Sequence, residues 1–414
     1  MTAMNVKSDS AKVTVDELLR RVREYGPRWR DRAEQTDRLR NLPDETVAEL
    51  HKIGVLKQFQ PTKYGGFAHD WGDLLKVGAE IARYCPSTAW IHSVVGMHTW
   101  MAGRFGHEAQ EEIFADPDVL IATAFAGGHN IQANVVDGGY RVTGQWKYSS
   151  GVNHSQWAIV AAQPETSTIE EHDFTLLAVP KGDFTYNDSW HTTGLRGTGS
   201  NDIILKDVFV PKHRTTRMTS FNNYISPEDN PHPEYIYHVE VSPYFGTNII
   251  APALGCAKGA FETYVELTKG RVGQLFGEKI STQVPVQVRI GTSAAEIRAA
   301  EEIINRVIRY LHKAGIEGRR VHKSERVELR GDTTLAANLL MSSVERLIKM
   351  MGAKGLTFDN PVQRYYNDLR AIVAHQIFQW DHGMAPYGQW ALGLPIADAG
   401  MESAPDGRKT LFET

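Results

Sequence analysis

One short stretch of the sequence combines an aromatic ring, two hydroxyls and a glycine. It runs from Gly144 to Gly151 and contains Trp146, Ser149 and Ser150. Apolar and polar residues alternate on the way into it, as is typical of a β-strand. A flat aromatic side chain, hydroxyl groups and a glycine that admits close backbone approach suit a planar heteroaromatic ligand. A strand that ends in a turn on a sheet surface is the alternative interpretation.

Two pairs of histidines could act as proton donors or acceptors near neutral pH. His92 and His98 are six residues apart in a helical pattern, so they point to different faces and at most one serves a common site. His375 and His382 are seven residues apart, two turns along nearly one face of a helix predicted over residues 361–392. A histidine satisfied within the core or on the surface is the alternative for each.

The composition is that of an ordinary globular protein and narrows the functional classes. The chain has 414 residues, 42% hydrophobic and 23% charged, with a net charge of −4, so we expect neither a nucleic-acid nor a membrane partner. Cys85 and Cys256 form no CxxC motif, which favours a reduced, cytoplasmic location. The polar N-terminus has no apolar signal core, and no stretch reaches transmembrane length.

The elements that would position these residues follow a clear order along the chain. Helices are predicted at about 71–84, 87–104 and 107–115, and again at 246–272, 284–316, 322–352 and 361–392. Strands are predicted between them at Trp157–Ala162, Phe174–Val179 and Ile203–Val210, with a hairpin at Asp137–Gly139. Four long helical segments joined by short loops predict a four-helix bundle. The fold class is α+β and mainly α.

Two common cofactor signatures are missing from the sequence. No GxGxxG motif follows a predicted strand, so we expect no nicotinamide site. The bundle has no pair of Glu-x-x-His motifs, so we expect no metal centre.

Four motifs, in order along nearly the whole chain, resemble the acyl-CoA dehydrogenase fold. They are Gly144-x-Trp146 running to Gly151, Leu195–Ser200 leading to Val208–Pro211, Arg271-x-x-Gln274-x-Phe276–Gly277, and Met351–Gly355 followed by Asn360–Pro361 and Asp368. The resemblance implies an N-terminal α-helical domain (1–117), a middle β-barrel domain (118–240) and a C-terminal four-helix bundle (241–414).

One departure from that family is informative. The dehydrogenases carry a Tyr-Glu-Gly-Thr box after the position of Asp368, and its Glu removes a substrate α-proton. Here the region reads from His375 to His382 as HQIFQWDH, and the box is absent. The sequence in this region is instead similar to the oxygenase components of two-component flavin monooxygenases of this fold, such as the hydroxyphenylacetate and steroid-phenol hydroxylases.

This second resemblance implies an enzyme that uses reduced flavin and O2, through a C4a-hydroperoxyflavin, to hydroxylate a small aromatic, phenolic molecule. It implies a separate NAD(P)H:flavin reductase and a homotetramer, and it leaves FMN and FAD both open. An acyl-CoA dehydrogenase or oxidase is one alternative. A flavin-dependent oxygenase acting on sulfur, nitrogen or indole is the other.

The resemblance also implies roles for individual residues. His375 would lie near flavin C4a, and His98, or else His92, would face the substrate. Ser149 would meet flavin N5, with Ser150 as the alternative, since neighbours on a strand point to opposite faces.

The remaining implied roles concern flavin binding. Trp146 would pack on the isoalloxazine, and Arg196, Thr198 and Ser200 would present a glycine-rich turn to the flavin. Arg271, with Gln274 and Phe276, would reach a flavin phosphate across a subunit interface.

Overall fold

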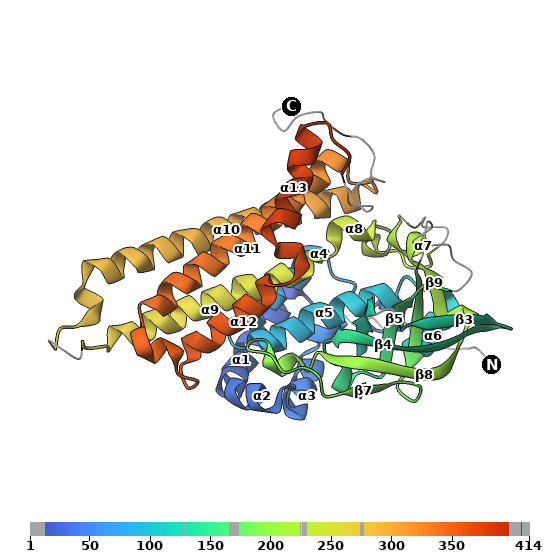
Figure 1. The fold of residues 1–414 in the computed structure, drawn as a ribbon, viewed down its shortest axis with the longest axis horizontal. Helices are drawn as coiled ribbons and strands as arrows, with labels where there is room; N and C mark the ends of the chain where they lie inside the picture. The colour runs from blue at the N-terminus through green and yellow to red at the C-terminus, as the bar shows by residue number, and fades with distance from the viewer. Residues whose placement is uncertain are drawn as a thin grey trace, which may run out of the picture.

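The computed structural model describes residues 13–127, 130–164, 174–223, 225, 230–273, 277–396 and 407. The chain builds a helical N-terminal part, a central β part and a bundle of long helices that extends to one side (Figure 1).

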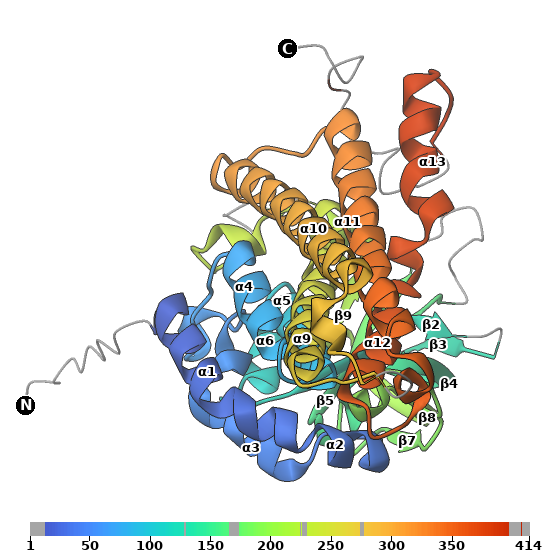
Figure 2. The same ribbon diagram turned by 90° about the vertical axis from the view of Figure 1, so that its left-hand side faces the viewer.

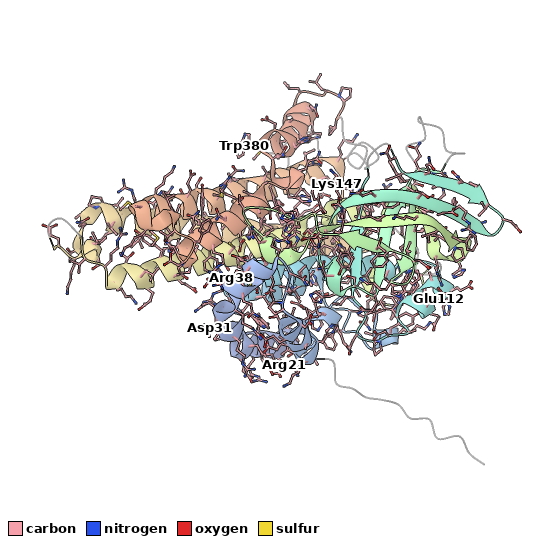
Figure 3. All side chains as sticks on the ribbon, turned by 60° about the horizontal axis from the view of Figure 1, so that its bottom comes forward. Arg21, Asp31, Arg38, Glu112, Lys147 and Trp380 are labelled. Atoms are coloured by element: carbon pink, nitrogen blue, oxygen red, sulfur yellow. The ribbon has the colours of Figure 1, made fainter. Side chains whose placement is uncertain are left out.

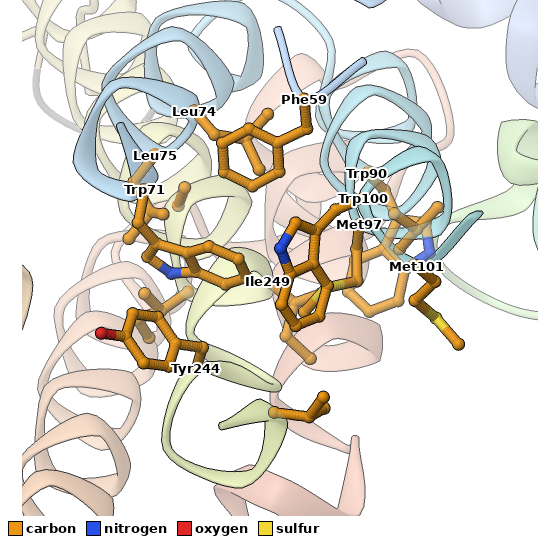
Figure 4. Close-up of a cluster of buried hydrophobic side chains, with 14 of the residues drawn as sticks. Phe59, Trp71, Leu74, Leu75, Trp90, Met97, Trp100, Met101, Tyr244 and Ile249 are labelled. Atoms are coloured by element: carbon orange, nitrogen blue, oxygen red, sulfur yellow. The ribbon is translucent and has the colours of Figure 1, made fainter. Parts of the chain in front are cut away.

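The N-terminal part is all-helical, as predicted. It contains α1 (Val15–Asp31), α2 (Ala33–Leu39), α3 (Asp44–Ile53), α4 (Trp71–Ala82), α5 (Pro86–Ala102) and α6 (His107–Ile113). Helix α5 is buried along its whole length, because it packs against α4 on one side and against the sheets and the bundle on others. Figure 4 shows Trp90, Met97 and Met101 along this helix, within the largest apolar core. Side chains of α5 therefore reach all three parts of the molecule.

The middle part consists of two sheets that pack face to face. One sheet has the order β1 (Ile121–Ala124), β5 (Trp157–Ala162), β6 (Thr175–Pro180) and β9 (Thr215–Arg217). The other has β2 (Ala126–Gly127), β4 (Gly139–Ser149), β8 (Asn201–Pro211) and β7 (Thr185–Asn187), with β3 (Gln132–Val136) also paired to β4. The hairpin predicted at Asp137–Gly139 joins β3 to β4.

The expectation of a closed β-barrel is wrong for the described strands. Neither ladder joins the other, and the strands at the two ends of each order, namely β1, β9, β2 and β7, have only two to four residues. The two sheets instead bury a common apolar layer that includes Val142, Trp146, Leu177 and Ile203.

The C-terminal part forms the predicted bundle from α9 (Ile250–Lys269), α10 (Val284–Ile316), α11 (Lys323–Lys349) and α12 (Pro361–Val373). The fourth helix was predicted to run to residue 392. In the structure it is broken: α12 ends at Val373, and a separate helix, α13, spans Trp380–Ala391. Helix α13 lies along α11 and stands away from the body (Figures 1 and 2). Trp380 marks its first turn in Figure 3, where Lys147 marks strand β4.

The connection between the sheets and the bundle contains α7 (Met218–Asn222) and α8 (Val241–Tyr244). None of the described helices is both long and apolar enough to cross a membrane. Within the described ranges, no three His, Cys, Asp or Glu side chains gather as metal ligands would.

Candidate active site

A cavity of about 440 Å³ lies where the three parts of the molecule meet. Its walls come from α5, the end of β1, α7, the turn after α8, α11 and residues 375–377. Most of its lining is apolar and includes Met101, Phe125, Met218, Phe221, Phe245 and Ile377. His375, Gln376, Thr333 and Arg326 are among its polar groups. A mostly apolar cavity of this volume with a few polar groups is typical of a site for a small organic molecule.

His375 lies in the cavity wall, at the break between α12 and α13. The prediction that it sits mid-helix is wrong: its backbone is extended (φ −60°, ψ 136°), and its Nδ1 accepts the Ile377 N–H at 3.4 Å. This cap starts a short 3₁₀ turn and prevents the helix from continuing. His375 keeps an exposed face, and desolvation by the protein around the rest of the ring lowers its pKa, which favours the neutral form. His382 is exposed on α13 and does not line the cavity.

The His375 ring lies 6.4 Å, between centroids, from the ring of Trp90 on α5. On its other side, the Trp90 indole donates its Nε1–H to Ser150 Oγ at 2.9 Å. From there a row of hydroxyls continues, with 2.7 Å from Ser150 to Ser200 and 2.7 Å from Ser200 to Thr198. Trp90 therefore links His375 of the cavity wall to the hydroxyl row.

The hydroxyl row depends on a tight turn at residues 195–199. Leu195 and Gly199 both adopt left-handed backbone conformations (φ 49° and 51°), which bring Thr198 and Ser200 beside the end of β4. The buried carboxyl of Asp368 on α12 accepts the Leu195 N–H at 2.6 Å and fixes the turn. Burial and the neighbouring Asp37 raise the pKa of Asp368 well above its ordinary value.

Arg196 lies in the same turn, and its guanidinium donates to backbone carbonyls of the protein. Its Nε donates to Asp37 O at 3.1 Å and one terminal nitrogen to Thr192 O at 2.8 Å.

The two serines at the end of β4 have different environments. Ser149 has no exposed surface, and its hydroxyl donates to Thr123 O at 3.1 Å. Ser150 retains some exposure and belongs to the hydroxyl row. The geometry thus favours Ser150, the alternative in the sequence-based prediction, as the serine that a ligand can meet.

The aromatic face of β4 also differs from the prediction. Trp146 is fully buried between the sheets, where its Nε1 donates to Ala161 O at 2.7 Å, so it is a core residue with no surface for a ring. A β-bulge follows it, and Tyr148 takes φ 68°. Tyr148 is 62% exposed and lies edge-on to Trp190, with ring centroids 5.9 Å apart. The aromatic ring that β4 offers to a ligand is therefore Tyr148.

The structure separates the two histidines of α5. His98 faces the middle part, where Nδ1 donates to Ile121 O at 2.7 Å and Nε2 accepts the Thr123 hydroxyl at 2.8 Å. Because a carbonyl can only accept, His98 is the neutral Nδ1–H tautomer. His92 turns into the helical part and bonds Gln58 at 2.8 Å. Burial lowers the pKa of His98 to about 4 and that of His92 to about 3.

Arg271 lies at the far end of the bundle from the cavity. Its guanidinium donates to Met350 O and Met351 O at 3.1 Å each and thereby caps α11. Gln274 and Phe276 lie outside the described residues.

Three contributors to this region were missed from the sequence: Trp90, Thr123 and Phe125. Trp90 lies two turns before His98 on one face of α5, and Met101 follows on that face. This face of α5 does not stand out in the sequence, because every residue of the helix is buried and apolar residues occur on all of its sides.

Family models and relatives agree on the class of this protein. The N-terminal domain of the acyl-CoA dehydrogenases matches residues 15–117, and their C-terminal domain matches residues 248–380. The oxygenase subunit HsaA of a flavin-dependent monooxygenase from Mycobacterium tuberculosis is 34% identical over 396 residues, covering 94% of this chain and 97% of its own.

Two further relatives are similar over nearly their full length. The oxygenase component of an FADH2-dependent resorcinol hydroxylase from Rhizobium is 30% identical over 91% of this chain and 94% of its own. The structure of XiaF from Streptomyces, in complex with FADH2 and glycerol, has a TM-score of 0.86 at 29% identity and covers 93% of this chain and 97% of its own. The chain belongs to the flavin-dependent monooxygenase oxygenase subunits of the acyl-CoA dehydrogenase fold, a class that hydroxylates phenolic aromatic compounds with reduced flavin.

The hydroxyl row is compatible with a reduced flavin. Ser150, Ser200 and Thr198 carry one proton each, and all three protons are used within the protein, so the row can only accept further hydrogen bonds. A reduced flavin presents ring N–H groups that such acceptors can take. The exposed ring of Tyr148 beside Trp190 adds an aromatic surface next to the row.

Proposed function

We propose that this chain binds reduced FAD beside β4 and the 195–199 turn, and hydroxylates a phenol held in the cavity. The observation that carries the proposal is the position of Trp90, which contacts the cavity residue His375 on one side and Ser150 on the other. A flavin at Ser150 and a ring in the cavity would thus lie against the same side chain. When bound, the reduced flavin supplies the electrons that activate O2 for insertion of one oxygen atom into the ring.

FAD is the proposed flavin because the relatives from Rhizobium and Streptomyces are described with FADH2. Ser150 and Tyr148 would contact the ring system in this chain, next to Thr198 and Ser200. Arg271, with Gln274 and Phe276, would serve the phosphates from a neighbouring subunit of a homotetramer, since it lies far from Ser150 within one subunit. Arg196 would act by holding the turn rather than by contacting the flavin.

The substrate hydroxyl would be handled by Thr123 and His98. Thr123 lies in β1 shortly before Phe125 of the cavity wall, and its proton already points to His98 Nε2. A phenol that donates to Thr123 Oγ1 would be oriented and polarised by this chain of hydrogen bonds, because Thr123 donates its own proton to the neutral imidazole of His98. The Nδ1–H bond to Ile121 O holds the ring in the tautomer that this step needs. A phenol ring that is polarised in this way is more electron-rich, so it would react more readily with an electrophilic oxygen atom.

His375 would act at the boundary between flavin and substrate. Its Nδ1 accepts the Ile377 N–H, so the neutral ring carries its proton on Nε2 and can donate it into the site. The apolar walls formed by Met101, Phe125 and Phe221 would exclude water during the reaction. A separate flavin reductase would supply the reduced flavin.

The proposal is tested with the purified chain, chemically reduced FAD and O2. A panel of substituted phenols, aryl sulfides, indoles and acyl-CoA esters is supplied, and products and hydrogen peroxide are measured together. We expect catechol-type products from phenols, formed in place of peroxide. Oxidation of sulfides or indoles without any phenol product, or bleaching of bound flavin by an acyl-CoA, would contradict the proposal.

A further inference from the structure

The direction of every hydrogen bond in the hydroxyl row is fixed by simple counting. The Leu195 carbonyl can only accept, so Thr198 donates to it at 2.9 Å. Ser200 must then donate to Thr198, and Ser150 must donate to Ser200, because each hydroxyl has a single proton. The Trp90 indole donates to Ser150. All protons of the row therefore point away from Trp90 and toward Leu195.

Ser150 is left with one lone pair and no free proton. Its hydroxyl already accepts one hydrogen bond from Trp90 and donates one to Ser200. A ligand atom that meets Ser150 must therefore donate. In reduced flavin N5 carries a hydrogen, whereas in oxidised flavin N5 is a bare acceptor that would face the Ser150 lone pair with no proton between them.

We infer that Thr198 and Ser200 determine the redox selectivity of the flavin site. By occupying the proton of Ser150, they favour a reduced flavin at this position and disfavour an oxidised one. The inference rests on the proposed flavin site at Ser150. Thr198 and Ser200, which would not contact the flavin themselves, would thereby determine whether the chain retains reduced or oxidised flavin.

The strength of this selectivity follows from what reversal of the row would cost. The Leu195 carbonyl also accepts the Trp190 Nε1–H at 2.8 Å and the Thr198 N–H at 3.2 Å. If all the hydroxyls turned around, the Leu195 carbonyl would lose the Thr198 hydroxyl proton but keep these two donors. Reversal would therefore cost about one hydrogen bond, which corresponds to roughly a fivefold change in the ratio of the dissociation constants of oxidised and reduced flavin. Thr198 holds the row in its direction, and Ser200 transmits that direction to Ser150.

The test measures equilibrium binding of FAD and, without oxygen, of FADH2. Ser200→Ala leaves Ser150 with a proton to donate, so we expect oxidised FAD to bind roughly fivefold more tightly and FADH2 to change little. Thr198→Val lets Ser200 turn toward Ser150 and should act in the same direction, whereas Thr198→Ser should keep the parent ratio. Thr192→Val is the matched control, because it removes a hydroxyl that bonds Gly194 O in the same loop, outside the row.

A second probe identifies the flavin atom involved. 5-Deaza-FAD has carbon in place of N5, so Ser200→Ala should not improve its binding. A gain that persists with 5-deaza-FAD, or a parent-like ratio in both Ser200→Ala and Thr198→Val, overturns the inference while the flavin site stands. A parent chain that binds neither FAD nor FADH2 overturns the flavin site and the inference together.

Discussion

Burial of His98 and His92 predicts that the protein loses stability as the solution is acidified. The pKa of His98 is lowered to about 4 and that of His92 to about 3, whereas a histidine in the unfolded chain titrates near its ordinary value of 6.5. As pH falls below 6.5, the unfolded chain therefore takes up protons that the folded protein refuses. The free energy of unfolding falls with pH across this window, down to the folded pKa of each residue.

The expected loss can be worked out for each histidine. Between pH 7 and pH 5, His98 and His92 should each remove about 2 kcal/mol from the free energy of unfolding. His98→Gln replaces the imidazole with an amide that can still donate and accept but does not titrate, so it should reduce the pH-dependent loss by about 2 kcal/mol. His92→Gln is the matched control, because it should flatten the pH dependence equally.

The two variants should differ in activity. His98 bonds Thr123 beside the cavity, whereas His92 bonds Gln58 within the helical part. Only His98→Gln should lower the yield of hydroxylated product per reduced flavin at pH 7.

The assay is urea unfolding followed by tryptophan fluorescence at pH 7 and pH 5, at one fixed protein concentration. If His98→Gln retains the full pH dependence of the parent, His98 is not held neutral by burial and the reasoning is wrong.

Two further predictions concern His375 in the cavity wall and Arg104, which holds the carbonyl of Phe221 from that wall. His375→Ala should divert at least tenfold more reduced flavin to hydrogen peroxide, measured as the product-to-peroxide ratio. His382→Ala, on the exposed surface of α13, is the control and should match the parent. Equal ratios in the two variants would refute a role for His375. Arg104 is 5% exposed and donates to four backbone carbonyls, those of Phe221, Asn223, Tyr237 and Val239. Arg104→Met should therefore lower the free energy of unfolding by at least about 3 kcal/mol, measured by thermal unfolding. Arg104→Lys should recover part of this loss. An unchanged melting temperature in Arg104→Met would contradict that clamp.

Element types could be predicted from the sequence, but one local irregularity in β4 changed which side chains face a ligand. The resemblance placed Trp146 and Ser149 toward the flavin, whereas the bulge at Tyr148 leaves Tyr148 and Ser150 as the more accessible aromatic and serine side chains. A positive φ at a tyrosine has no signature in a pattern of polar and apolar residues, because it is imposed by pairing with β8. The assignment of the faces of this motif therefore needed the structure.

The helix break at His375 was hidden for a related reason. Neither glycine nor proline marks it, and the break depends on a side-chain cap to Ile377 N together with the packing of α13 on α11. Gly383 allows that packing, since a side chain there would overlap Thr334. The closure of the sheets into a barrel was likewise expected from resemblance alone, whereas the described edge strands are too short to meet.

Helix α5 fixes the distance between the flavin side and the substrate side of the proposed site. Trp90 and His98 are eight residues apart, which corresponds to about 12 Å along a helix. Both are bonded to the middle part, Trp90 through Ser150 and His98 through Ile121 and Thr123, and the helix between them is wholly buried. A buried helix that is anchored at both positions cannot readily adjust to substrates of different size. Adaptation to a particular phenol must therefore come from the opposite walls of the cavity, at α7, α8 and residues 375–377, where substitutions can reshape the cavity without moving the flavin contact at Ser150.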